Sequence, residues 1–232
     1  MITNGGWSAL QNTQFTDVNG AFVTIGSGIS RQFVLVVGWS DQTVNPNVQV
    51  SIGGQSAVRS AHSTIGGNGV DIFTWSESAI AAMSDLKIVE TSGSYSPGNL
   101  GWAFVTLSGV DQTAGINPQG FGQGITTATV DSPAPGACDY GILAASQTTG
   151  SAAFTGHTPS AYTVQIEGSA GGIRAIVCDA TSRPSESPTV TCSTQDIKAV
   201  VLGFNVSLGI PPQPVIGRRR QFFVDDTLVL VP

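Results

Sequence analysis

Histidines and carboxylates are the residues from which this sequence could build a catalytic site, and it contains few of them. The two histidines, His62 and His157, lie in stretches rich in Ser, Thr and Gly and belong to no HExxH, HxH or nucleophile-elbow motif. Nothing in the spacing fixes two glutamates at the separation that glycoside hydrolysis requires; the glutamates are Glu77, Glu90, Glu167 and Glu186. We therefore predict no catalytic residues, and solvent-exposed side chains at these positions.

Glycine clusters and aspartates offer no clear ligand site either. None of the clusters at 53–54, 66–69 and 168–172 opens a helix, which a phosphate-binding loop must do, so we interpret them as hairpin turns. A structural calcium ion stays open as an alternative, because several aspartates lie in predicted loops, although no DxDxDG spacing is present. These are Asp17, Asp41, Asp111 and Asp131. We expect no other metal and no cofactor.

The tryptophans and cysteines each allow two interpretations. Trp39, Trp75 and Trp102 could form a sugar-stacking face, but each lies in or at the end of an apolar strand, which favours burial in the core. Cys178 and Cys192 flank a predicted loop, and a hairpin centred on this loop would place them opposite each other within reach of a disulfide. Two reduced thiols are the other interpretation. Cys138 is expected to be a buried thiol.

The elements that must position these residues are short strands. Each predicted strand is rich in Val, Ile, Phe, Thr and Trp and is bounded by turn residues, and only residues 76–84 resemble a helix. No segment is typical of a crossover helix, so we predict an all-β, antiparallel β-sandwich of the jelly-roll type. The predicted strands are 21–25, 32–39, 48–52, 71–75, 86–90, 102–107, 125–130, 139–145, 162–166, 173–178, 189–192 and 198–206.

Charge and hydropathy exclude several classes of function. The 232 residues carry a net charge of −6, which argues against a protein held to nucleic acid by a basic face. No apolar run approaches the ~18 residues of a membrane-spanning helix, so no membrane insertion is expected. The first residues lack the basic and apolar regions of a secretory signal, which predicts a protein made in the cytoplasm.

Several segments, in their order along the chain, resemble a known architecture. They are Ser30–Ser40 (SRQFVLVVGWS), Val48–Gln55 (VQVSIGGQ) and Gly101–Thr113 (GWAFVTLSGVDQT), followed by 136–145 and a closing strand at 199–204. The pattern resembles the concanavalin-like, jelly-roll modules of bacterial surface proteins and of tailed-phage virion proteins. The resemblance covers residues 20–207 and implies the fold, but such modules serve binding, adhesive and structural roles.

The C-terminal residues differ in composition from the rest. Residues 1–19 are expected as an N-terminal arm, 20–207 as the sandwich, 208–216 as a proline-rich linker and 217–232 as an assembly tail. The tail joins a basic triplet to two apolar, β-prone runs, which suits adding a strand to a neighbouring sheet. The expected anchor residues are Arg218, Arg219, Arg220, Phe222, Phe223, Val224, Leu228 and Leu230.

These features predict a structural virion protein of a tailed bacteriophage, located in the virion and not an enzyme. It would be a capsid decoration, head-fibre or tail-associated subunit, homo-oligomeric and in contact with other virion proteins. The alternative is a carbohydrate-binding or adhesin module that recognises host-surface glycans. A glycan-active enzyme is a third hypothesis, and turnover of a polysaccharide that depends on one carboxylate would support it.

Overall fold

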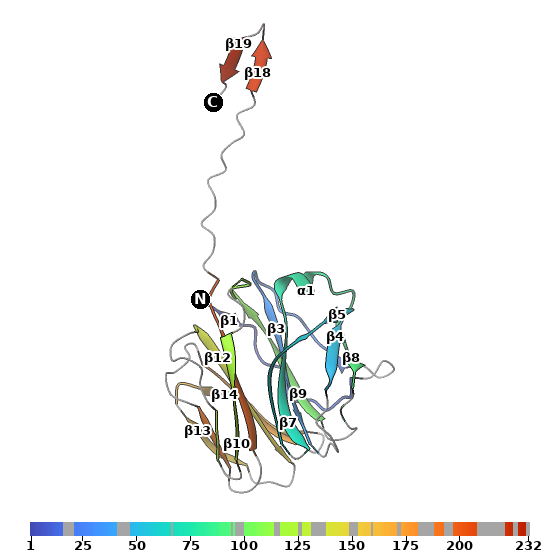
Figure 1. Ribbon diagram of the computed structural model, residues 1–232, viewed down its shortest axis with the longest axis vertical. Helices are drawn as coiled ribbons and strands as arrows, with labels where there is room; N and C mark the ends of the chain where they lie inside the picture. Colours follow the sequence, from blue (N-terminus) through green and yellow to red (C-terminus); the bar gives the residue numbers. More distant parts are fainter. Residues whose placement is uncertain are drawn as a thin grey trace.

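The structure is a computed structural model, and its described part is almost entirely β-sheet (Figure 1). For residues 221–224 and 227–230 the structure describes the backbone alone. The described residues are 1–15, 21–40, 47–65, 67–93, 95, 100–113, 117–124, 127–130, 138–148, 153–158, 160–170, 173–180, 188–192, 197–207, 221–224 and 227–230. Every strand pair within them is antiparallel, so the predicted all-β antiparallel sandwich is confirmed, while the jelly-roll assignment stays a prediction.

Strands from the first half of the chain form two sheets. The larger one, here called inner sheet I, has the order β1-β9-β3-β7-β6, and the smaller one, outer sheet I, has the order β2-β8-β4-β5. The strands are β1 (Thr3–Asn4), β2 (Ala21–Phe22), β3 (Gln32–Trp39), β4 (Gln49–Ile52), β5 (Gln55–Ser56), β6 (Val58–Ile65), β7 (Asn68–Trp75), β8 (Lys87–Ser92) and β9 (Leu100–Ser108). The short helix α1 (Glu77–Ala81) connects β7 to β8.

The second half repeats this arrangement. Inner sheet II has the order β10-β17-β12-β15-β14, and outer sheet II has the order β11-β16-β13. Taken in chain order, each strand of the second half occupies the place of its counterpart in the first half, and the described part of the second half lacks a match for β5 and α1. The strands are β10 (Asn117–Gly124), β11 (Thr127–Thr129), β12 (Tyr140–Thr148), β13 (Phe154–Thr158), β14 (Thr163–Ala170), β15 (Ile173–Ala180), β16 (Thr189–Cys192) and β17 (Ile197–Phe204).

Three apolar cores hold the four sheets together in layers. Because side chains alternate along a strand, inner sheet I buries Leu35 and Trp39 against outer sheet I, and Val34 and Val36 against inner sheet II. A third core lies between inner sheet II and outer sheet II. Both inner sheets are thus covered on both faces, which explains the continuous apolar runs of β3 and β17. Figure 1 shows the two halves side by side.

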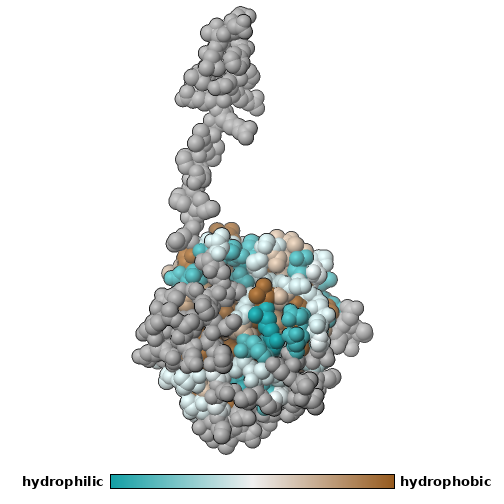
Figure 2. Space-filling model, in the orientation of Figure 1, coloured by the Kyte–Doolittle hydropathy of each residue, from teal (hydrophilic) through white to brown (hydrophobic). Residues whose placement is uncertain are grey.

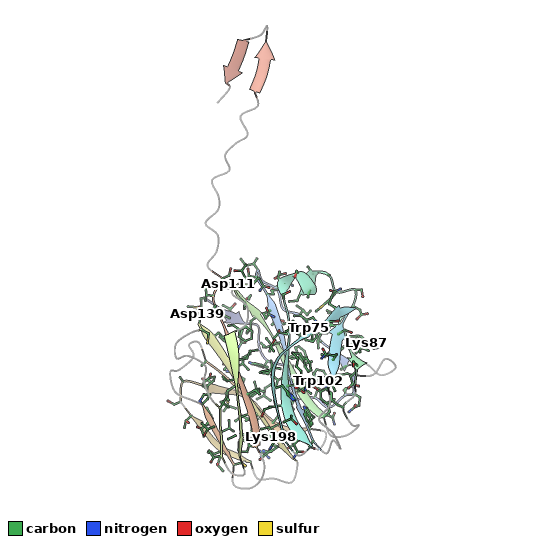
Figure 3. The ribbon with its side chains drawn as sticks, viewed as in Figure 1. Trp75, Lys87, Trp102, Asp111, Asp139 and Lys198 are labelled. Atoms are coloured by element: carbon green, nitrogen blue, oxygen red, sulfur yellow. The ribbon has the colours of Figure 1, made fainter. Side chains whose placement is uncertain are left out.

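The three central tryptophans are buried, as predicted. Trp39, Trp75 and Trp102 all lie in the core between inner and outer sheet I, and Figure 3 shows Trp75 and Trp102 inside the first half. The ring of Trp39 covers Gly69 on β7 so closely that a Cβ atom at this glycine would lie 2.3 Å from the ring. These tryptophans therefore offer no sugar-stacking face.

The local signals of turn and helix match the structure. Gly53 and Gly54 connect β4 to β5 with φ values of +53° and +78°, a pair of left-handed residues that two-residue hairpin turns require. The helix predicted at 76–84 is α1, and its N-cap Ser76 accepts a hydrogen bond from the backbone N–H of Ala79. Residues 3–11, expected in an arm, pair along β9 at the edge of inner sheet I.

The hairpin predicted to join Cys178 and Cys192 is wrong. Cys178 on β15 pairs with Leu143 and Val164 in inner sheet II, whereas Cys192 on β16 pairs with Phe154 in outer sheet II. β15 and β16 lie in different sheets, so the two strands are not neighbours in a sheet. All three cysteines, including Cys138, are buried and none forms a disulfide, so the interpretation of Cys178 and Cys192 as two reduced thiols fits the structure.

Candidate functional site

Asp71 on β7 is the centre of a charged cluster in the first half. Its carboxylate is fully buried, and one oxygen, Oδ2, accepts hydrogen bonds from Trp39 Nε1 and the Tyr95 hydroxyl, each at 2.8 Å. The other oxygen, Oδ1, accepts from Arg59 Nε at 2.7 Å and lies 2.5 Å from His62 Nδ1. β6 supplies Arg59 and His62, and the register opposes His62 to Asp71 directly.

His62 therefore does not fit the prediction of a solvent-exposed loop residue. It lies within β6, its side chain is three-quarters buried, and its ring stacks on Trp39 with 6.5 Å between centroids. His62 Nδ1 lies between Asp71 Oδ1 and Arg59 Nη2, which is 2.8 Å away, and the other ring nitrogen, Nε2, is buried without a hydrogen-bond partner. The polar surroundings of His62 in the sequence gave no indication of its burial, because they come from an edge strand.

An aspartate that orients a histidine is half of a familiar catalytic arrangement, but the other half is absent from the described residues. A nucleophile or substrate-facing group would have to reach Nε2, which no described side chain does. Instead, both carboxylate oxygens of Asp71 accept hydrogen bonds from donors within the fold. Burial and the negative charge of Asp71 raise the pKa of Tyr95 well above its ordinary value, which keeps this hydroxyl a donor. The cluster joins β6 to its neighbour β7 and holds Tyr95 against inner sheet I.

A second buried aspartate fastens the N-terminal segment to the second half. Asp179 Oδ2 accepts hydrogen bonds from Asn4 Nδ2 at 2.8 Å, from Trp7 Nε1 at 3.0 Å and from the Tyr140 hydroxyl, while Oδ1 accepts from Gln165 Nε2 at 2.9 Å. Burial, followed by the hydrogen bond and charge of Asp179, raises the pKa of Tyr140. Both aspartates thus serve the packing of the fold.

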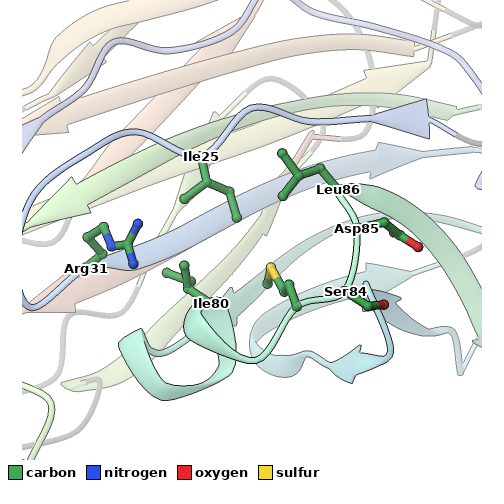
Figure 4. A pocket seen from close by; sticks show the side chains of 7 residues that line it. Ile25, Arg31, Ile80, Ser84, Asp85 and Leu86 are labelled. Carbon is green, nitrogen blue, oxygen red and sulfur yellow. The ribbon is translucent and has the colours of Figure 1, made fainter.

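An apolar hollow of about 280 Å³ opens on the first half beside α1. Figure 4 shows Ile25 and Leu86 on one side of the space and Ile80 opposite them, with Arg31 at one end and Ser84 and Asp85 at the other. Met83 completes the lining. The hollow can take apolar side chains; it contains no cluster of groups suited to proton transfer.

An ion pair forms one end of the hollow. Arg31 Nη2 lies 2.5 Å from Glu77 Oε1, and Glu77 Oε2 also accepts the backbone N–H of Arg31 at 2.6 Å. The hydrogen bond from Arg31 holds the pKa of Glu77 below its ordinary value. Gln112 joins this end to the end of β9, because its side chain accepts from the backbone of Glu77 and donates to the carbonyl of Arg31.

Residues 205–207, the last described residues of the sandwich, lie close to this ion pair. The backbone N–H of Ser207 donates to the carbonyl of Gly109. The backbone N–H of Gly109 donates to the carbonyl of Ile29, two residues before Arg31. Asp139 accepts from the backbone of Val206, and the backbone N–H of Asp111 donates to Asn205. Figure 3 shows Asp111 and Asp139 at the end of the sandwich that bears the C-terminal strands.

The predicted anchor residues fall in part outside the described residues. Arg218–Arg220 lie outside them, and for Phe222, Phe223, Val224, Leu228 and Leu230 the backbone alone is described. That backbone forms a hairpin of β18 (Gln221–Val224) and β19 (Thr227–Leu230), in which Phe222 pairs with Val229 and Phe223 with Leu228. The hairpin is a two-stranded sheet of its own, and its role as an anchor stays a prediction.

The remaining predictions concern calcium binding, catalysis and membrane insertion. Asp17, Asp41 and Asp131 lie outside the described residues, whereas Asp111 binds the backbone N–H and hydroxyl of Thr113. Within the described ranges no three His, Cys, Asp or Glu side chains are placed to hold a metal ion, and no helix is long and apolar enough to cross a membrane. His157 Nε2 lies 2.7 Å from the carbonyl oxygen of Tyr162, as a local contact on β13.

No protein family, curated protein or solved structure matches this chain.

Proposed function

We propose that this protein is a structural, non-catalytic virion subunit of a tailed bacteriophage, whose C-terminal residues 217–232 anchor it to neighbouring subunits. The assignment to a capsid decoration, head fibre or tail-associated subunit comes from the sequence resemblance of residues 20–207. The anchoring role comes from the C-terminal hairpin.

The hairpin is the observation that carries the proposal. β18 and β19 have four residues each and pair with each other and with no other described strand. A two-stranded sheet this short is at best marginally stable in water. Its sequence, QFFV and TLVL, is rich in large apolar residues that a lone hairpin leaves in contact with water. Such a segment gains stability by packing on a partner, and a subunit of a larger assembly has one.

The polar clusters agree with a non-catalytic role. Both buried aspartates are saturated by donors from the fold itself, and the hollow beside α1 is lined mainly by apolar side chains. The glycan-binding alternative loses Trp39, Trp75 and Trp102 as a stacking face, since all three are buried. No observation favours it specifically.

Deleting residues 217–232 tests the proposal. The shortened protein should stay folded with a melting temperature near that of the full chain, because the three cores lie within residues 2–204. It should no longer co-purify with intact particles, whereas the full chain should do so at a fixed copy number. A deletion variant that does not fold, or one that still attaches to particles, would defeat the proposal.

A further inference from the structure

The hollow beside α1 marks a difference between two halves that otherwise share one strand order. Five of its seven lining residues, Ile80 and 83–86, come from α1 and the turn that follows it. The described part of the second half has no element in that place, between β15 and β16. The α1 segment that lines the hollow thus has no counterpart among the described residues of the second half.

Large apolar side chains are exposed in the hollow and in the chain segments next to its lining residues. Leu86 is 38% exposed, and Phe22, which pairs with its neighbour Lys87, is 67% exposed. Ile29, 81% exposed, lies two residues from Arg31 at the other end. Figure 2 shows polar and apolar residues mixed over the described part of one face of the molecule, and grouped large apolar residues are uncommon on a monomer. These side chains indicate a surface that a partner covers.

The C-terminal tail has the chemistry to be that partner. It carries large apolar residues directly after the triplet Arg218–Arg220. Residues 218–232 have three basic and two acidic side chains, whereas residues 1–217 have six basic and thirteen acidic, a net charge of −7. The hollow itself presents Asp85 at its rim. The apolar and basic tail thus complements an apolar hollow on an acidic body.

We propose that the hollow lined by Ile25, Ile80, Met83 and Leu86 receives the C-terminal hairpin of a second copy of this chain, with the arginine triplet near Asp85. This inference rests on the proposed anchoring function and names the surface that the tail binds. Among the described strands, β18 and β19 pair only with each other, and a second copy of the chain offers the same hollow to the hairpin. The contact is head to tail, because the hollow of one chain receives the hairpin of another.

Full-length variants test the contact. Leu86→Asp places a charge in the hollow and Phe223→Asp places one in the tail. Val164→Asp is the matched control, because Val164 on β14 is exposed to the same extent, 39%, in the second half. Sedimentation equilibrium measures self-association, and a thermal melt measures folding. Leu86→Asp and Phe223→Asp should each weaken association about tenfold or more, while Val164→Asp and the melting temperatures stay unchanged.

Mixing the two defective variants decides whether the contact joins different chains. In an equimolar mixture, the hairpin of Leu86→Asp meets the intact hollow of Phe223→Asp, so 1:1 pairs should form although neither variant associates alone. A monomeric wild type, no pairing in the mixture, or an equal loss with Val164→Asp would overturn the inference. If both charged variants melt earlier and remain monomeric, the hairpin docks on its own chain, which also overturns it.

The proposed function can survive the failure of this inference. If deletion of 217–232 abolishes particle attachment while Leu86→Asp leaves self-association intact, the tail is an anchor but binds elsewhere. If the deletion leaves attachment intact, the anchoring function fails, and the choice of the hollow fails with it.

Discussion

Replacing Asp71 by Asn tests whether the buried carboxylate fastens the first half. The asparagine has nearly the same shape, but it removes the negative charge that faces Arg59 and turns one acceptor into an N–H donor. Donors converge on both oxygens of Asp71, from Trp39 and Tyr95 on one and from Arg59 and His62 on the other. Whichever way the amide is turned, its N–H group faces either Trp39 Nε1 or Arg59 Nε, neither of which can accept a hydrogen bond.

The expected cost follows from the burial of the group. Asp71 is fully buried and Arg59 is 16% exposed, so the substitution leaves a largely buried positive charge without its partner. Removing one member of a buried ion pair costs about 3–5 kcal/mol of unfolding free energy. For a chain of this length each kcal/mol lowers the melting temperature by about 2–4 °C. We therefore expect Asp71→Asn to melt roughly 6–20 °C below the wild type.

Thermal and urea unfolding followed by tryptophan fluorescence measures this change. Glu167→Gln is the control, because the Glu167–Arg174 pair is solvent-accessible, with side chains 31% and 25% exposed, and such a pair contributes about 0–1 kcal/mol. Asp71→Asn and Glu167→Gln with equal melting temperatures would refute the reasoning, since the cluster would then contribute no more than a surface ion pair.

Three further predictions concern the core and its titrating groups. Trp102→Ala should lower the unfolding free energy by about 3–5 kcal/mol, because the ring is fully buried and its Nε1–H donates to the carbonyl of Thr13. Urea titration measures this change, and an unchanged midpoint of urea unfolding would contradict the place of Trp102 in the core. Burial raises the pKa of Tyr95 and Tyr140, so the folded protein keeps protons that the unfolded chain releases above about pH 10. The unfolding free energy should be independent of these groups below that pH and should fall above it by up to about 1.4 kcal/mol per pH unit for each tyrosine. Tyr→Phe substitutions at both positions should remove this slope. A slope that persists in the doubly substituted protein would contradict the assignment. Burial raises the pKa of the Cys178 thiol to about 12, so a thiol reagent at pH 8 should label Cys178 only in urea, as peptide mass spectrometry can show; rapid labelling of the native protein would contradict its burial.

The side-chain pattern predicted the buried strands and missed polar edge strands. Residues 32–39 and 189–192 match β3 and β16, because strands with buried faces carry a strong apolar signal. The pattern missed β6, β10 and β13, and each of these lies at the edge of its sheet. An edge strand meets solvent on one side and tolerates Ser, Thr and Gly, so its composition resembles that of a loop.

The charged cluster at Asp71 was hidden for the same reason. The glycines at 66–67 were recognised as a hairpin turn, and counting outward from a two-residue turn pairs residue 65 with 68 and residue 62 with 71. This count places His62 opposite Asp71, but it requires a strand before the turn, which the polar sequence of β6 did not indicate. The contacts of Asp71 with Trp39 and Tyr95 join distant segments, and no local pattern contains them.

The repeated strand order was not apparent from the sequence. A topology constrains which positions are apolar more than it constrains which apolar residue stands at each position. Its consequence concerns symmetry. Two sandwiches placed back to back are what a two-fold symmetric dimer would provide, and such a dimer would carry every surface feature twice. Within one chain the two halves can differ, and in the described part only the first half bears α1, with the hollow beside it. A subunit with one such surface and one tail has a direction. Copies joined in this way form a closed ring or an open filament, without branching, and the angle of the joint sets the number of subunits per ring.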